Sequence, residues 1–448
     1  MKKILEKIIE YLFYLFVFTF VWQTKLIIVP AETNYNEIAL YFNYLLLALI
    51  LIIFIFYFFK YKRNEAINNF DFAKYWVALA GMEFFIFLSI FASSVRAVSI
   101  FKYILFLLSF GLLFLMTQFK FNFKKIILIF LSALLFQASL GIFQFFSQKS
   151  FSNKYLGIAS HEASVLGVSV LENDLGRFVR AYGATDHPNV FGALMFFAIF
   201  FVILLLVIDP YLEFSSLNNK VSSGFKEGER NKKYRGRKIL FYFVLLIFII
   251  ALMVSFSRSA FLALGLSLIF LFLTSLFNKN SFKKYYPIFI FCLTSILLFF
   301  IIFKPLIVNR FKLSSRLEKI SISERSEQIG EASKIIKSNP WLGVGLGAYH
   351  NKVLELNPTW ESYQAQPVHN TFLLSLAEIG LWGFILFLLF IFYIIKKNVL
   401  QVHYFPLFIG IFVFMAFDHW LWSLPFGLLF MFFLFGLTFY FKYDKVHG

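Results

Sequence analysis

One histidine and two arginines stand out as reactive or charged side chains: His369 and Arg258 adjoin long apolar segments, whereas Arg325 lies in a long polar stretch. His369 directly precedes Asn370 and the apolar run TFLLSLAEIGLWGF, so its ring is expected at the N-terminus of a helix. The positive end of the helix dipole disfavours an imidazolium and keeps the ring neutral, so that it can accept a proton. His369 therefore suits a general base, and the alternative is a purely structural histidine at the helix end.

The two arginines suit the binding of an anion. Arg258 separates two apolar runs in SFSRSAFLALG, and Arg325 lies in the polar stretch SERSEQIGEASK. A guanidinium keeps its charge and presents a planar fork of donors that fits phosphate. The structural alternatives are a long cationic side chain that reaches the membrane interface, for Arg258, and a solvated helix face, for Arg325. Taken alone, Arg325 does not identify a site.

Two further strings place polar residues where lipid would penalise them. AYGATDHPNVFG contains His187 and Asn189 at the start of an apolar segment, and FDHWLW contains Asp418 and His419 at the end of another. Such residues line a cavity or cap a helix. We predict that Asn370, His187 and Asp418 support the residues named above.

Apolar helices must position all these residues. The chain has 448 residues, of which 60% are hydrophobic and 15% charged, and its mean hydropathy of +0.77 is too high for a water-soluble fold. Runs such as IALYFNYLLLALILIIFIFYFF reach the roughly 20 residues that a helix needs to cross a bilayer. We therefore predict an all-α, polytopic transmembrane bundle of about twelve helices over residues 11–29, 38–59, 76–93, 101–117, 126–146, 190–208, 239–256, 260–277, 287–303, 371–395, 405–417 and 421–441.

The net charge of +18 comes from basic residues whose distribution agrees with a bundle of transmembrane helices. Lys and Arg gather in short loops at alternate helix ends, which is the positive-inside pattern rather than a nucleic-acid surface, so no nucleic-acid partner is expected. With a cytoplasmic N-terminus, the polar basic linker 209–238 lies inside. Segments 147–187 and 304–369 then face outward, and the second is expected to be a large, partly helical loop with an amphipathic helix that ends at Pro340.

The sequence lacks the motifs of several other kinds of chemistry. Gly343, Gly345 and Gly347 are spaced like a dinucleotide fingerprint, but no predicted strand precedes them. The sequence contains no P-loop, no zinc-ligand spacing and no nucleophile elbow, and the single Cys292 lies in an apolar run. We expect no metal and no cofactor, so the energy for a reaction must come with its substrate.

Taken in order, these strings resemble the O-antigen ligase and polymerase family of bacterial membrane glycosyltransferases. SRSAFLALG is similar to its arginine motif, ERSEQIGEASKIIKSNPWLGVGLGAYH to its large outer loop and HNTFLLSLAEIGLWGF to its histidine-headed helix, and the likeness covers roughly residues 241–437. It divides the chain into an N-terminal transmembrane region, 1–240, and a ligase-like region, 241–441, which contains loop 304–369 between the ninth and tenth spans.

The resemblance also implies an activity. In that family two arginines and a histidine in these contexts form the active site, and here they are Arg258, Arg325 and His369. The expected activity is that of a metal-independent, inverting glycosyltransferase at the outer face of the bacterial cytoplasmic membrane. Its donor would be a glycan on a polyprenyl pyrophosphate such as undecaprenyl pyrophosphate, and its product a cell-surface polysaccharide such as lipopolysaccharide.

The residue types fit that chemistry. The arginines would stabilise the departing pyrophosphate in place of a metal, and the histidine would take the proton from a hydroxyl of a glycan or lipid acceptor. A polymerase that extends another lipid-linked glycan is the closest alternative. A flippase or secondary transporter is a further alternative, but it predicts related helix halves, and the sequence has no such internal repeat.

Overall fold

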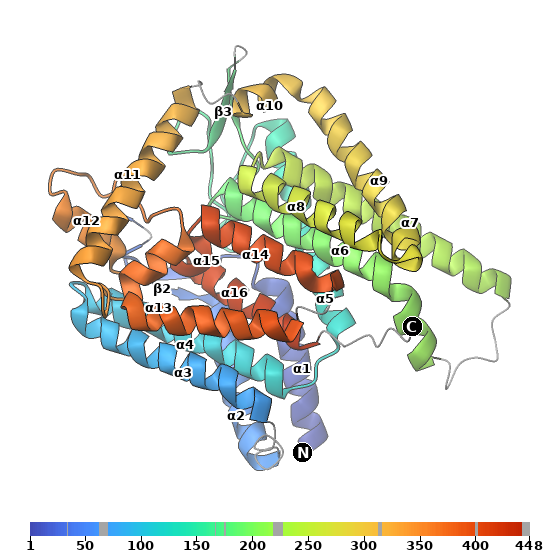
Figure 1. Cartoon of the computed structure of the whole chain (residues 1–448), viewed down its shortest axis with the longest axis horizontal. Helices are drawn as coiled ribbons and strands as arrows, with labels where there is room; N and C mark the ends of the chain where they lie inside the picture. Colours follow the sequence, from blue (N-terminus) through green and yellow to red (C-terminus); the bar gives the residue numbers. More distant parts are fainter. Residues whose placement is uncertain are drawn as a thin grey trace.

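The computed structural model describes residues 1–33, 35–61, 70–165, 167–173, 176–217, 227–311, 316–398 and 402–440. Over these residues the chain is a bundle of long helices with two short β-hairpins (Figure 1). The first half contains α1 Lys2–Thr19, β1 Lys25–Val29, β2 Ile38–Tyr41, α2 Phe42–Tyr61, α3 Phe70–Ser89, η2 Ile90–Ala92, α4 Arg96–Gln118, α5 Phe123–Ser147, β3 Val170–Asn173, β4 Gly176–Val179 and α6 Pro188–Leu217.

The second half begins with three long helices and ends with a short, deeply buried one. Its elements are α7 Glu227–Val254, α8 Arg258–Ser275, α9 Lys279–Ile302, α10 Lys304–Phe311, α11 Arg316–Ser338, α12 Tyr349–Leu356, α13 Thr371–Asn398, η3 Val402–Tyr404, α14 Phe405–Phe417, α15 Trp420–Ser423, α16 Pro425–Leu437 and η4 Thr438–Tyr440.

The helices have the length and composition of a multi-pass membrane protein. Among the described residues, eight helices are long and apolar enough to cross a membrane, and the shorter apolar segments Trp76–Ala92, Val402–Phe417 and Pro425–Tyr440 accompany them. Each of the twelve predicted segments contains a helix, so the helical fold class is confirmed. The number of crossings stays a prediction.

Two predictions of local structure need correction. The first predicted helix does not extend to residue 29, because Lys25–Val29 pairs antiparallel with Ile38–Tyr41 as a hairpin. The sequence KLIIV is rich in β-branched residues, which favour a strand over a helix. The polar segment 209–238 is helical at both of its ends, in α6 and α7, while residues 218–226 lie outside the described part.

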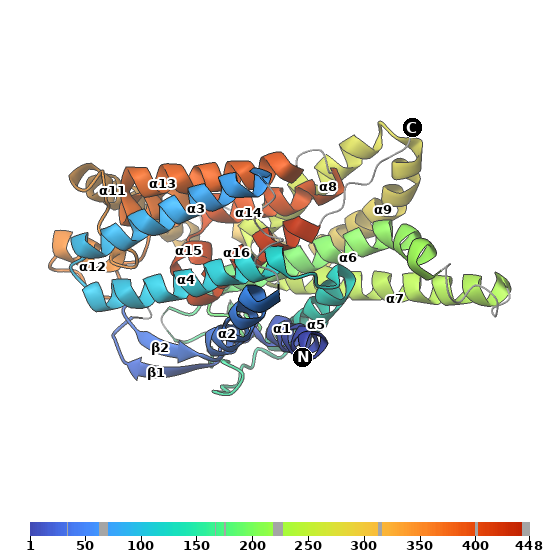
Figure 2. The ribbon, with the colours of Figure 1, turned by 90° about the horizontal axis from the view of Figure 1, so that it is seen from below.

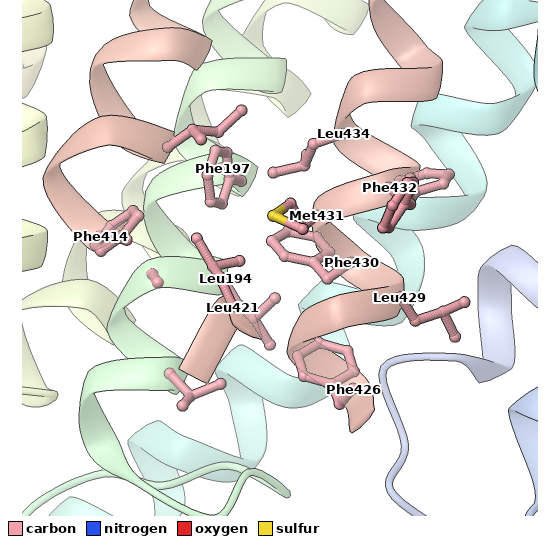
Figure 3. Packing of buried hydrophobic residues seen from close by; sticks show 14 of the residues in the cluster. Leu194, Phe197, Phe414, Leu421, Phe426, Leu429, Phe430, Met431, Phe432 and Leu434 are labelled. Atoms are coloured by element: carbon pink, nitrogen blue, oxygen red, sulfur yellow. The ribbon is translucent and has the colours of Figure 1, made fainter. Parts of the chain in front are cut away.

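The core lies around α16. All residues of Pro425–Leu437 are buried, and Figure 3 shows Phe430, Met431 and Leu434 on the side of α16 that faces α6 and α14. Phe430 meets Phe197 of α6 edge to face, with ring centroids 5.2 Å apart. A helix that is apolar on every side suits the centre of a bundle, so α16 forms a fixed core for the outer helices.

The long loop between α9 and α13 is partly helical, as predicted. α11 ends at Ser338, just before Pro340, because proline cannot continue the hydrogen-bonding pattern of a helix. In Figure 2, α11, α12 and the β1–β2 hairpin lie at one end of the bundle, while α7 projects from the other end.

A glycine-rich turn fixes this loop on α13. The N–H of Val344 donates to the carbonyl of Ala377 at 3.0 Å, and the N–H of Leu381 donates to the carbonyl of Pro340 at 2.8 Å. α13 is interrupted at Gly380, whose φ of 66° is unfavourable for other residues. The two backbones are so close that a Cβ at Gly380 would lie 2.3 Å from the carbonyl oxygen of Trp341. The loop that contains α11 is therefore held against the beginning of α13.

Candidate active site

The junction between α7 and α8 positions Arg258. Phe256 has a φ of 48°, a left-handed conformation that reverses the chain between the two helices. Ser257 then caps α8, because its side chain accepts a hydrogen bond from the N–H of Ala260. This cap makes Arg258 the first residue of α8, and its side chain is half-buried.

Arg258 lines a cavity of about 190 Å³ together with two other arginines. Arg258 comes from α8, Arg310 from α10 and Arg325 from α11, and each has further interactions in the structure. Arg310 also donates from Nε to the carbonyl of Phe256 at 3.3 Å, which ties α10 to the α7–α8 junction. We call this space the arginine cavity, and its lining consists of Asn189, Arg258, Ser259, Leu262, Arg310, Arg325 and Phe417.

The composition of this lining selects for an anion. Guanidinium groups stay charged at any physiological pH, and three of them contribute to this lining. Arginine forks bind the oxygens of phosphate through paired, charge-assisted hydrogen bonds. The cavity is thus electrostatically suited to a phosphate or pyrophosphate group.

His369 belongs to a cluster with Asp418 and His419. The rings of His369 and His419 meet edge to face with centroids 5.1 Å apart. Asp418 and His419 are buried between α14 and α15. The Nδ2 amide of Asn189 donates to Oδ2 of Asp418 at 3.1 Å, and Asn189 also lines the arginine cavity. Asn189 therefore links the histidine cluster to the arginine cavity.

Burial keeps the histidines of this cluster neutral. It lowers the pKa of His369 below its usual value, while the negative charge of Asp418 opposes the shift and the positive charge of Arg325 reinforces it. Burial likewise lowers the pKa of His419 to about 4. Burial opposes ionisation of Asp418, but the neighbouring His419, His369 and His187 hold the pKa of its carboxyl below the usual value. The cluster thus combines a neutral imidazole with an ionised carboxylate.

The predicted supporting residues have distinct structural contacts. His187 accepts the N–H of Asn189 at Nδ1, at 3.1 Å, and its Nε2 lies 2.9 Å from the hydroxyl of Ser169. Asn370 caps α13, since its Oδ1 accepts the N–H of Leu373 at 2.9 Å. His187 therefore orients Asn189, whereas Asn370 fixes the start of the helix that follows His369.

Arg258 and Arg325 line one cavity, and His369 lies in the adjoining cluster. Their catalytic roles stay predictions, as do the supporting roles of the other residues. Sequence reasoning missed Arg310, which sits in the run KPLIVNRF without any distinctive spacing. It also missed Gln328, whose Oε1 lies 2.8 Å from Nδ1 of His369. Only the fold brings these two side chains to the site.

The spacing of the histidine cluster also permits a metal ion. One ligand atom each of His369, Asp418 and His419 lies within 4.8 Å of the other two. The neighbouring arginines make the surroundings cationic, which disfavours a divalent ion there. The absence of a metal requirement therefore stays a prediction, and it can be tested by chelation.

The helices and the site together define a class: a multi-pass membrane protein with a cationic cavity next to a neutral histidine. Residues 243–388 match the family model of the O-antigen ligases, and no curated protein matches the chain. Over this segment the chain is similar to the O-antigen ligase family, which confirms the resemblance expected from the sequence. The matched segment contains the cavity arginines and His369, whereas Asn189 and Asp418 lie outside it.

Proposed function

We propose that this protein is a membrane glycosyltransferase that moves a glycan from a polyprenyl-pyrophosphate carrier to an acceptor hydroxyl at the outer face of the cytoplasmic membrane. The observation on which the proposal rests is the arginine cavity beside His369, whose arginines and histidine lie in the segment that matches the O-antigen ligase model. An anion site next to a neutral imidazole supplies the two functions that such a transfer needs.

The reaction breaks the bond between the anomeric carbon and the phosphate oxygen, and negative charge develops on the departing pyrophosphate. Arg258, Arg310 and Arg325 would stabilise this charge through fork-shaped hydrogen bonds. The acceptor oxygen attacks the anomeric carbon from the opposite side, which inverts its configuration, and His369 takes the hydroxyl proton. All atoms are accounted for, since the carrier pyrophosphate leaves and the proton passes to the histidine.

The surface of α8 supports a prenyl carrier. Leu262 lines the arginine cavity one turn beyond Arg258 and is 41% exposed. Leu266, Ile269 and Leu273 continue the exposed apolar stripe along the same helix at helical spacing. A pyrophosphate in the cavity could therefore extend its apolar tail along α8 into the lipid.

Ligase and polymerase activity share this donor chemistry and differ in the acceptor. A ligase makes a single transfer to a glycan or lipid acceptor, while a polymerase extends another lipid-linked glycan and makes a ladder of products. The proposal commits to the ligase, and the size of the product separates the two activities.

The test uses purified protein in liposomes with a polyprenyl-pyrophosphate glycan and candidate acceptors, and it measures released carrier and product size. His369→Ala should lower the rate by ~10²- to 10⁴-fold, the usual contribution of a general base. Arg310→Ala should lower it by ~10²- to 10³-fold, the usual cost of losing a charge-stabilising donor. Full release by either variant would contradict the assigned role.

A matched control is available in the same loop. Arg316 of α11 is 66% exposed and pairs with Glu172 at 2.8 Å, away from the arginine cavity. Arg316→Ala removes the same charge from the loop and should leave carrier release unchanged. An equal loss in Arg316→Ala and Arg310→Ala would mean that net loop charge, rather than the cavity, governs the rate.

A further inference from the structure

Gln328 of α11 holds the ring of His369 through its side-chain amide. Its Oε1 lies 2.8 Å from Nδ1 of His369, and the backbone N–H of His369 donates to the same oxygen at 3.4 Å. The ring Nδ1 and the backbone N–H of His369 thus both approach Oε1 of Gln328.

This convergence fixes the orientation of the amide. If the amide were flipped, its NH₂ group would face the backbone N–H of His369, and two donors would oppose each other. The oxygen must therefore point to His369. Because an amide oxygen only accepts hydrogen bonds, Nδ1 of His369 must be the protonated ring nitrogen.

The same helix face reaches both parts of the site. Arg325 lines the arginine cavity, and Gln328 lies three residues later, on the same side of α11. Ala332 and Ile335 continue this face and are fully buried. Packing of the apolar end of α11 therefore positions an arginine and an amide together.

We propose that Gln328 is a positioning residue that holds His369 in the Nδ1–H tautomer, so that Nε2 is the nitrogen that accepts the proton of the acceptor hydroxyl. The inference rests on the proposed function for its catalytic meaning. The tautomer itself does not depend on that function. A neutral imidazole that lacks such a partner can carry its proton on either nitrogen, and in one of the two forms Nε2 is no base.

Two substitutions of similar size separate this role from packing. Gln328→Met keeps the shape of the side chain but removes the acceptor, whereas Gln328→Glu keeps an oxygen acceptor for Nδ1–H. At metal sites, loss of the partner that orients a histidine ring typically costs roughly 10- to 100-fold in activity, and we expect the same order for an orienting partner here. We therefore expect Gln328→Met to lower kcat by about that factor with an unchanged KM for the donor, and Gln328→Glu to stay less than about tenfold below the parent.

Glu327 provides the control, because it neighbours Gln328 but is exposed. Glu327→Met introduces the same residue on the outer face of α11 and should retain the parental kcat. A Gln328→Met enzyme with the parental kcat, or a Gln328→Glu enzyme as slow as Gln328→Met, would overturn the proposal.

A spectroscopic measurement gives a readout without catalysis. ¹⁵N spectra of histidine-labelled protein distinguish protonated from unprotonated ring nitrogens, and a His369→Asn sample assigns the signals of His369 among the seven histidines. We expect a proton on Nδ1 in the parent and a mixture of tautomers in Gln328→Met. An Nε2–H form in the parent would overturn the proposal. If the parent shows the Nδ1–H tautomer of His369 but releases no carrier, Gln328 positions His369 as proposed, and the transferase activity is refuted.

Discussion

At the scale of single residues, charges of opposite sign act on His369 from different elements. Arg325 lies on α11, and Asp418 and His419 lie in the connection between α14 and α15. The charge of Asp418 also acts on His187, the residue that directly precedes α6. The carboxylate favours an imidazolium at His369, whereas the guanidinium and burial oppose it. The balance keeps the ring neutral, the state required of a base.

This balance predicts the pH dependence of transfer. Because burial lowers the pKa of His369 and the base must be neutral, kcat/KM should fall on acidification only below the ordinary histidine range around pH 6.5. Asp418→Asn removes the negative charge that stabilises the imidazolium, so it should shift the acidic limb to lower pH. Carrier release measured from pH 4.5 to 8 checks this, and a shift to higher pH would contradict the assigned electrostatics.

A second prediction at this scale concerns metals. Since arginines are proposed to stabilise the pyrophosphate, chelation with EDTA should leave carrier release within about twofold of the untreated rate. The assay should include elemental analysis of the purified protein. Loss of activity on chelation, restored by one divalent ion, would instead make His369, Asp418 and His419 a metal centre.

The sequence predicted only part of this site. Arg258, Arg325 and His369 stand in strings with a family likeness, so they could be named from the sequence. Asn189 was singled out as a polar residue that lines a cavity or caps a helix, and it lines the arginine cavity. Arg310 and Gln328 reach the site only through the packing of α10 and α11, and no periodicity or local spacing contains that information.

At the scale of elements, the contact between the glycine-rich turn and α13 is the feature that holds α11 near His369. Helices were predictable because their apolar runs are long, while Lys25–Val29 was assigned wrongly because a short apolar run suits a strand as well. The interruption of α13 at Gly380 was not foreseen, since one glycine in an apolar run is compatible with a regular helix.

The contact predicts a large effect of a small substitution. Gly380→Ala would place a Cβ 2.3 Å from the carbonyl oxygen of Trp341 in a backbone region reserved for glycine, at a cost of roughly 1–3 kcal/mol. We expect a lower Tm and a loss of carrier release. Gly265→Ala in α8 meets no atom within 4 Å and should change neither. Unchanged thermal unfolding and activity in Gly380→Ala would show that the glycine-rich turn can move enough to accommodate a Cβ at this position.

At the scale of the whole molecule, the positive-inside pattern predicts that the long loop between α9 and α13 lies on the outer side. In a Cys292→Ala background, Thr359→Cys in that loop should react with an impermeant maleimide on spheroplasts. Lys283→Cys, at the start of α9, should react only after permeabilisation. Both positions are exposed in the structure, so access across the membrane decides the labelling. The reverse pattern would invert the topology and remove the proposed site from the outer face.

The residues around the arginine cavity and the histidine cluster are far apart in the chain. Asn189 precedes the family-matched segment, and Asp418 follows it. During translation the arginines of α8, α10 and α11 therefore emerge well before Asp418 and His419, which reach the membrane near the end of synthesis. A chain that stops after α13 contains the guanidinium groups but lacks the carboxylate beside His369. Such a chain also lacks Phe417 of the cavity lining and α16, on which the outer helices pack, so the complete site can assemble only after the last helices have been synthesised.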